Sequence, residues 1–118
     1  MAKKKLRFFQ KPACSTCRKA KELLNTLGAD FELRSLDEDP LSEEELDALI
    51  GARDYKQFLN TRNELYREKN MKERPPTRAL AIKLMAQTPN LIRRPVVVHG
   101  EQVIVGYDEE AFRKLMRP

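Results

Sequence analysis

The spacing of apolar residues changes twice in the first third of the chain. A short apolar-rich run at 6–9 predicts a buried strand, which ends at a loop that contains proline. Over 17–27 apolar residues recur every three to four positions, and this spacing predicts a helix that Gly28 ends. Alternation in "DFELRSL", with Phe31 and Leu33 on the buried side, predicts a second strand. The order is therefore strand, loop, helix, strand.

The middle of the chain has only helical patterns. We expect helical segments at 42–50, 54–59, 63–69 and 77–86. Ser42 and Glu45 have the spacing of a capping box at the start of the first segment. The last segment begins after two prolines, and Leu80, Leu84 and Met85 are its apolar positions. This helical block separates the two regions that have strand patterns.

Strand patterns return near the end of the chain. Two β-branched runs, 96–98 and 103–105, flank a turn that contains glycine and predict a β-hairpin. A last helix follows, with Asp108 as its N-cap and with an apolar face formed by Phe112, Leu115 and Met116. A β-α-β unit, a helical block and a β-β-α unit together predict an α/β protein with a thioredoxin-like fold and a mixed four-stranded sheet.

Composition narrows the class of protein. At 118 residues, with 41% hydrophobic and 35% charged residues, the chain is typical of one globular domain. We expect a single domain over 1–118, with a helical insertion at about 40–90. No apolar run approaches the roughly 18 residues that span a bilayer, and "MAKKKLRFF" lacks the apolar stretch of a signal peptide. We therefore expect a cytoplasmic protein without a membrane partner.

The net charge of +5 does not by itself indicate a nucleic-acid partner. Lysine and arginine alternate with acidic residues almost throughout, as in "REKNMKER". Such interleaving is typical of a solvated surface rather than of a basic stripe, so we expect no direct DNA binding.

Two cysteines, Cys14 and Cys17, lie at the predicted junction of the first strand and first helix. A tetrahedral zinc site needs four ligands, and the chain offers only His99 as a further soft ligand, so we expect no metal. We interpret His99 as a residue of the hairpin turn. A permanent disulfide would close a very small loop and remove little entropy from the unfolded chain. These considerations leave a redox or nucleophilic pair, or two cysteines merely packed beneath a helix.

The position of Cys14 favours the reactive interpretation. It comes just before the first helical turn, where unpaired backbone N–H groups and the helix dipole stabilise a thiolate. Cys17, one turn later, is placed to attack a mixed disulfide formed on Cys14. Nearby positive charge is expected from Lys11, Arg18 and Lys19.

The segment "LIRRPVVV" is a second candidate element of the site. Pro95 opens the third predicted strand, and strand initiation alone would explain it. In a thioredoxin-type fold, however, a cis proline at this position would place Arg94 beside Cys14. The planar guanidinium could then hold an oxyanion, while Arg93 would point to solvent.

Four segments together carry a family resemblance. In order and spacing, "KPACSTCRKAKELL", "FLNTRNELY", "LIRRPVVV" and "VGYDEEAFRKL" resemble the arsenate reductase/Spx family of thioredoxin-like proteins, the ArsC family, over nearly the entire chain. The resemblance implies that Cys14 is the nucleophile, that Arg94 contacts an oxyanion before a cis proline, and that the helical block is the family's insertion. The substrate-binding residues expected with it are Pro12, Ser15, Thr16, Arg62 and Pro95.

Three departures from glutaredoxin-dependent arsenate reductases bear on the branch of the family. Those enzymes typically have no cysteine at the position of Cys17, carry a substrate arginine where this chain has Asn60, and carry another arginine where it reads Gly106-Tyr107. Arg62 would replace the first arginine only in part, because two positions along a helix turn a side chain by about 200°. The C-x-x-C and "VGYDEE" instead resemble Spx, and "LNTR" resembles the YffB-like relatives.

We therefore expect a thiol-disulfide oxidoreductase in which Cys14 attacks a small oxyanion or a disulfide and Arg94 orients it. Cys17 or an external thiol such as glutathione would resolve the adduct, with glutaredoxin or thioredoxin as further partners and no metal or organic cofactor. The alternative is an Spx-like redox-sensing regulator that binds the α-subunit of RNA polymerase. We rank it second because the chain ends directly after the last predicted helix.

Overall fold

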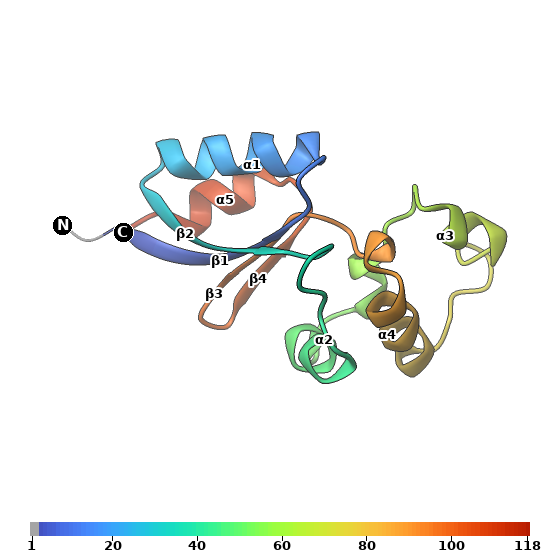
Figure 1. The fold of residues 1–118 in the computed structure, drawn as a ribbon. Helices are drawn as coiled ribbons and strands as arrows, with labels where there is room; N and C mark the ends of the chain where they lie inside the picture. The colour runs from blue at the N-terminus through green and yellow to red at the C-terminus, as the bar shows by residue number, and fades with distance from the viewer. Residues whose placement is uncertain (1–2) are drawn as a thin grey trace. The chain divides into compact units, whose positions relative to one another are not determined.

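The computed structural model describes residues 3–118, which form two compact units (Figure 1). One unit contains the chain up to Leu36 and again from Arg94 onward, and the other is Asp37–Arg93. The expectation of one domain over 1–118 with an inserted segment stays a prediction.

The first unit contains a four-stranded mixed sheet. Its elements are β1 (Lys4–Gln10), α1 (Ser15–Thr26), β2 (Ala29–Ser35), β3 (Val96–His99), β4 (Gln102–Val105) and α5 (Glu109–Leu115). The strand order is β2-β1-β3-β4, with β1 parallel to β2 and β3 antiparallel to both of its neighbours. Helices α1 and α5 lie on the same face of the sheet (Figure 1). This is the predicted thioredoxin-like α/β fold, which is confirmed.

The core of the first unit lies between this sheet face and the two helices. Phe8 of β1 pairs with Val97 of β3, and both side chains are fully buried. The buried cluster contains Leu6, Phe8, Cys17, Ala20, Leu24, Ala29, Val97, Phe112 and Leu115. Burial of these apolar side chains is the main term that holds α1 and α5 on the sheet. Cys17 is thus a core residue as well as a candidate site residue.

Two sequence expectations for this unit differ in outcome. Helix α1 ends just before Gly28, whose φ of 96° is a backbone conformation that glycine adopts without strain, so the predicted helix end is confirmed. Leu33 was expected on the buried side of its strand, but it is 49% exposed. Leu33 pairs with buried Phe8 of β1 and lies on the same face of the sheet. Because β2 is an edge strand, Leu33 has a neighbouring strand on one side only, which leaves it partly uncovered.

The second unit is helical, as predicted. Its elements are α2 (Glu43–Ile50), the 3₁₀ turn η1 (Tyr55–Phe58), α3 (Glu64–Glu68), α4 (Arg78–Gln87) and the 3₁₀ turn η2 (Pro89–Leu91). The capping box of Ser42 and Glu45 is present at the start of α2. The turn η2 was not expected. Pro89 begins it, in the position where proline is favoured.

The apolar positions expected for α4 are partly wrong. Met85 is buried, but the other buried residues are Ala81 and Ile82, and Leu80 is 46% exposed. Apolar residues occur on nearly every side of this helix, so periodicity alone does not identify the side that packs.

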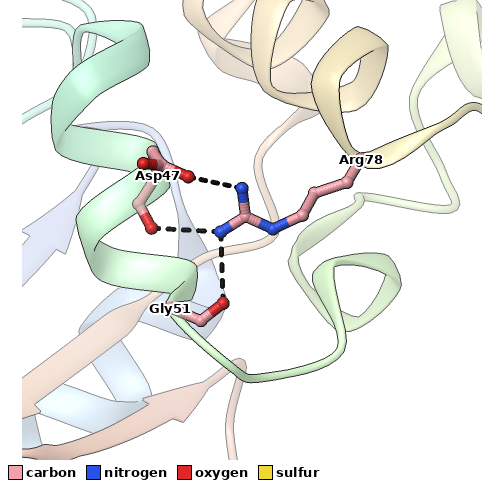
Figure 2. Close-up of polar contacts among 3 residues, drawn as sticks. All are labelled: Asp47, Gly51 and Arg78. Atoms are coloured by element: carbon pink, nitrogen blue, oxygen red, sulfur yellow. Dashed lines mark hydrogen bonds and ion pairs between the residues drawn. The ribbon is translucent and has the colours of Figure 1, made fainter.

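Within the second unit, Arg78 joins the start of α4 to the end of α2 (Figure 2). Its guanidinium forms an ion pair with the Asp47 carboxylate and donates hydrogen bonds to the carbonyl oxygens of Asp47 (3.2 Å) and Gly51 (3.1 Å). The Asp47 carbonyl also accepts the N–H of Gly51, so Arg78 gives it a second donor and gives the Gly51 carbonyl a donor at the C-cap of α2, where a cation is favoured. No helix within residues 3–118 is long and apolar enough to cross a membrane.

Candidate active site

Cys14 is the residue on which the candidate site is built. It follows the loop after β1 and is the N-cap of α1, with extended backbone angles (φ −125°, ψ 104°). Its Sγ atom accepts a hydrogen bond from the backbone N–H of Cys17 at 3.2 Å. The sulfur therefore takes the place of the oxygen acceptor that serine or aspartate usually supplies at an N-cap, where the helix dipole favours negative charge.

The two cysteines are both free thiols in different environments. Cys14 is partly exposed, whereas Cys17 is 1% exposed and belongs to the core cluster beneath α1. A reagent from solvent therefore meets Cys14 first. Cys17 lies one helical turn further on and is buried in the core.

The environments shift the two pKa values in opposite directions. Burial opposes ionisation of Cys14, but hydrogen bonds from Cys17 and the guanidinium of Arg94 outweigh it, so the pKa of Cys14 lies below its usual value. Burial raises the pKa of Cys17 to about 12, and the hydrogen bond with Cys14 and its negative charge add to that rise. The site thus stabilises the thiolate form of Cys14 and the protonated form of Cys17.

The Arg94-Pro95 peptide bond is cis, as predicted. Arg94 is half-buried with its Nε atom fully enclosed, and its guanidinium acts on the Cys14 sulfur through a hydrogen bond and through charge. Pro95 is buried and its carbonyl accepts a hydrogen bond from the N–H of Gly106 at 2.7 Å. Arg93 is exposed. The structure therefore brings Arg94 and Pro95 to Cys14 within one unit.

The remaining expected binding residues divide into two groups. Pro12 is exposed in the turn before Cys14, Ser15 is the exposed first residue of α1, and Thr16 is half-buried beside it. These three border the thiol in sequence and in the fold. Arg62 belongs to the second unit, where its N–H donates to the Asn60 side chain at 3.1 Å. Its role in substrate binding stays a prediction.

Sequence reasoning missed one neighbour of the site. Lys19, expected to add charge near Cys14, instead places its ammonium 4.5 Å from the centre of the Tyr107 ring. Tyr107 in turn packs edge-on against buried Phe112, with ring centres 5.6 Å apart. We had noted Tyr107 only as a departure from an arginine, and no spacing in the sequence pairs it with Lys19.

A metal fits this site poorly. Within residues 3–118 no three side chains of His, Cys, Asp or Glu gather into a set that could hold an ion. His99, the last residue of β3, stands next to the hairpin turn where we expected it. What the arrangement offers is a stabilised thiolate, a second thiol one turn away and a fixed guanidinium, which together suit attack on an electrophile and resolution of the product.

Comparison with known proteins agrees with this arrangement. Residues 9–115 match the model of the ArsC family. The uncharacterized protein YusI from Bacillus subtilis is 39% identical, over 92% of this chain and 96% of that protein. The global transcriptional regulator Spx from Enterococcus faecalis is 31% identical, over 94% and 86% respectively. The crystal structure of an ArsC family related protein from Bacteroides fragilis superposes with a TM-score of 0.82 at 35% identity, covering 98% of this chain and 99% of that one.

Proposed function

Because the chain belongs to the ArsC family, we propose that it is a cytoplasmic thiol-disulfide oxidoreductase with Cys14 as its nucleophile. The observation that carries the proposal is the contrast between the two thiols. Cys14 is accessible and has a lowered pKa beside Arg94, while Cys17 is enclosed and has a raised one. The thiolate is the reactive form of cysteine, so attack begins at Cys14.

With a disulfide as substrate, the reaction has two exchange steps. The Cys14 thiolate attacks one sulfur, forms a mixed disulfide and releases the other half of the substrate as a thiolate. Cys17 then loses its proton and attacks the Cys14 sulfur, which forms the Cys14–Cys17 disulfide and releases the second half. Glutathione, glutaredoxin or thioredoxin would supply the two electrons that return both cysteines to thiols.

The raised pKa of Cys17 does not block the second step. Part of the rise comes from the hydrogen bond with Cys14 and from the negative charge of that thiolate. Both contributions end once Cys14 is bonded to a substrate sulfur. The pKa of Cys17 then falls toward the value that burial alone sets, which makes Cys17 a better nucleophile in the intermediate than in the resting protein.

A trapping experiment tests this order of events. Incubation of the Cys17→Ser variant with oxidised glutathione should yield a stable adduct of one glutathione per chain, and peptide mass spectrometry should place it on Cys14. The matched Cys14→Ser variant should acquire little, since Cys17 is enclosed and protonated. Preferential labelling of Cys17 would reverse the assigned roles.

Arsenate is a narrower proposal for the substrate, supported by the family resemblance and by the guanidinium at Cys14. The thiolate would attack arsenic(V) with loss of water, and a second thiol would attack the Cys14 sulfur, returning an electron pair to arsenic and releasing arsenite. Arsenate-dependent oxidation of NADPH, with glutathione, glutaredoxin and glutathione reductase in excess, measures this activity. A rate no higher than that of Cys14→Ser would remove arsenate and leave disulfide exchange in place.

A redox-sensing regulator is the second candidate, favoured by the similarity to Spx along most of both chains. Oxidation of Cys14 and Cys17 would then alter a surface that binds the C-terminal domain of the RNA polymerase α-subunit. The test is capture of that domain by oxidised and by reduced protein, with Cys17→Ser as the control that cannot form the disulfide. Capture by the oxidised protein alone would favour the regulator over the enzyme.

A further inference from the structure

A pocket of about 510 Å³ lies in the second unit, and none of its lining residues belongs to the elements that carry the cysteines. It is lined by Thr61, Tyr66, Arg67, Asn70 and Lys72. All five belong to one short segment, which contains α3 and the turn after it. The function proposed above uses none of them.

The turn after α3 explains how a short segment forms a pocket. The N–H of Met71 donates to the carbonyl of Tyr66 and the N–H of Asn70 donates to that of Arg67, both at 3.0 Å. Asn70 has a positive φ of 49°, which asparagine tolerates better than most residues. These are the features of a Schellman motif, which ends α3 and reverses the chain between Arg67 and Lys72. Buried Met71 anchors the reversal, being only 3% exposed.

The pocket side chains are not used in contacts elsewhere. Within residues 3–118 no hydrogen bond or ion pair is formed by the side chains of the five lining residues, which are Thr61, Tyr66, Arg67, Asn70 and Lys72. Acidic residues occur on the same segment, namely Glu64, Glu68 and Glu73. None of these lines the pocket or forms an ion pair in the described chain. Arg67 and Lys72, both exposed, therefore line one pocket whose lining contains no carboxylate.

We propose that this pocket binds a phosphate monoester. The dianion has two charges to match Arg67 and Lys72, and its three terminal oxygens can accept hydrogen bonds from these cations and from the hydroxyl and amide groups. The volume lies within the roughly 300 to 1,000 Å³ of small-molecule sites and is far larger than a bare phosphate ion needs. The ring of Tyr66 offers a flat surface for an organic part, so an ester suits the pocket better than inorganic phosphate.

Adenosine monophosphate is a suitable probe, because it joins a phosphate to a flat base. Isothermal titration calorimetry on the reduced full chain would compare it with adenosine and with inorganic phosphate. We expect binding of the monophosphate, weaker binding of phosphate and no binding of adenosine. Backbone amide shifts in NMR spectra should change over 61–72 and leave the amides around Cys14 unmoved, which separates this site from the proposed active site.

Two variants and a matched control test the assignment. Arg67→Ala and Lys72→Ala should each weaken binding of the monophosphate about tenfold or more, as expected for loss of a charge-assisted hydrogen bond. Arg67→Lys keeps the positive charge, so it should retain part of the affinity, and it is the substitution expected to disturb the fold least. Arg74→Ala removes an equal charge from an exposed residue of the same segment that does not line the pocket, and should leave the affinity unchanged.

Three results would overturn the proposal. One is absence of binding for all probes at millimolar concentration. Another is equal weakening by Arg74→Ala and Arg67→Ala, which would show only diffuse attraction between charges. The third is a set of amide shifts centred on Cys14 and Arg94, which would show that the phosphate occupies the thiol site instead.

Discussion

Positive groups and hydrogen-bond donors gather at two places in this chain, the start of α1 and the turn after α3. At the first place the Cys14 sulfur accepts the N–H of Cys17, and this hydrogen bond and the Arg94 guanidinium stabilise the thiolate form of Cys14. At the second place Arg67 and Lys72 face a pocket with no acidic residue in its lining.

The same combination of positive groups and hydrogen-bond donors can therefore serve two different purposes. Where the anion is a residue of the chain, the surrounding donors set its protonation and hence its reactivity. Where no such residue is present, the donors are available to an external ligand. Arg78 illustrates a third use, because its guanidinium has a carboxylate and two carbonyl partners and serves to join two helices.

The largest effect is expected from removal of the Cys14 thiol at the start of α1. Cys14→Ser should reduce turnover of a glutathione mixed disulfide to the background rate, because a serine hydroxyl is not ionised at neutral pH. Cys17→Ser should retain a single round of thiol exchange and lose only turnover that depends on the internal disulfide. Enzymatic cycling with glutathione reductase measures both. Equal single-round rates for the two variants would contradict the assigned roles.

Removal of the cation should have a smaller effect than removal of the thiol. Arg94→Ala takes away one contribution that lowers the pKa of Cys14, so that pKa should rise toward its ordinary value. The rate of alkylation by iodoacetamide near neutral pH should fall several-fold, and the rate at a pH above both pKa values should change little. Arg93→Ala is the matched control, since this neighbouring arginine is exposed. A loss as large in Arg93→Ala would point to general charge rather than to a specific contact.

The raised pKa of Cys17 predicts how the stability of the reduced protein depends on pH. In the unfolded chain a cysteine ionises near pH ~8.5, whereas folded Cys17 keeps its proton up to about 12. Between these values the unfolded state binds fewer protons, so the free energy of unfolding should decrease as the pH rises, by up to about 1.4 kcal/mol per pH unit from this group.

Urea unfolding at several alkaline pH values checks this dependence. Lysine and tyrosine also titrate in this range, so the quantity to compare is the difference between the unmodified protein and Cys17→Ala. The variant should lose less stability as the pH rises. Parallel curves for the two proteins would show that Cys17 does not keep its proton on folding.

The smallest effects are expected at the two ion pairs formed by Arg78 and by Arg113. The groups are partly exposed, with 37% of the Arg78 side chain and 63% of that of Asp47 accessible, so screening by water limits the ion pair. Together with the two carbonyl contacts we expect Arg78→Ala to lower the free energy of unfolding by about 1 kcal/mol. Arg113→Ala removes the ion pair with Glu109 one turn away within α5, whose arginine side chain is 51% exposed, and should cost about half as much. Thermal unfolding monitored by circular dichroism compares the two.

The sequence predicts the first unit well because its patterns are local and agree with each other. Each element has a distinct pattern of apolar residues: the strand at 6–9, the helix that Gly28 ends and the β-branched hairpin. The order of these elements along the chain indicates the topology of the sheet. The cis bond before Pro95 follows from that topology rather than from the residues beside it. The position of Cys14 as the N-cap of α1 could be predicted because the strand pattern ends and the helix pattern begins on either side of it.

The second unit shows where such reasoning fails. Helix α4 is apolar on nearly every side, so Leu80 was assigned to the packed face although it is exposed. The turn after α3 has Asn70 where glycine would have signalled a Schellman motif, and no other local residue marks it. Without that turn, Arg67 and Lys72 look like two charges of a solvated surface. The pocket depends on a reversal of the chain that neither composition nor period reveals.

The most direct test of the central claim is a pH titration of thiolate absorbance in the fully reduced protein. Cys14 should give an inflection clearly below pH ~8.5, the ordinary value for a cysteine. That inflection should be absent from Cys14→Ser, should persist in Cys17→Ser, and should move upward in Arg94→Ala. A single inflection at or above pH ~8.5 in the unmodified protein would contradict the account, because Cys14 would then be an ordinary thiol and not an activated nucleophile.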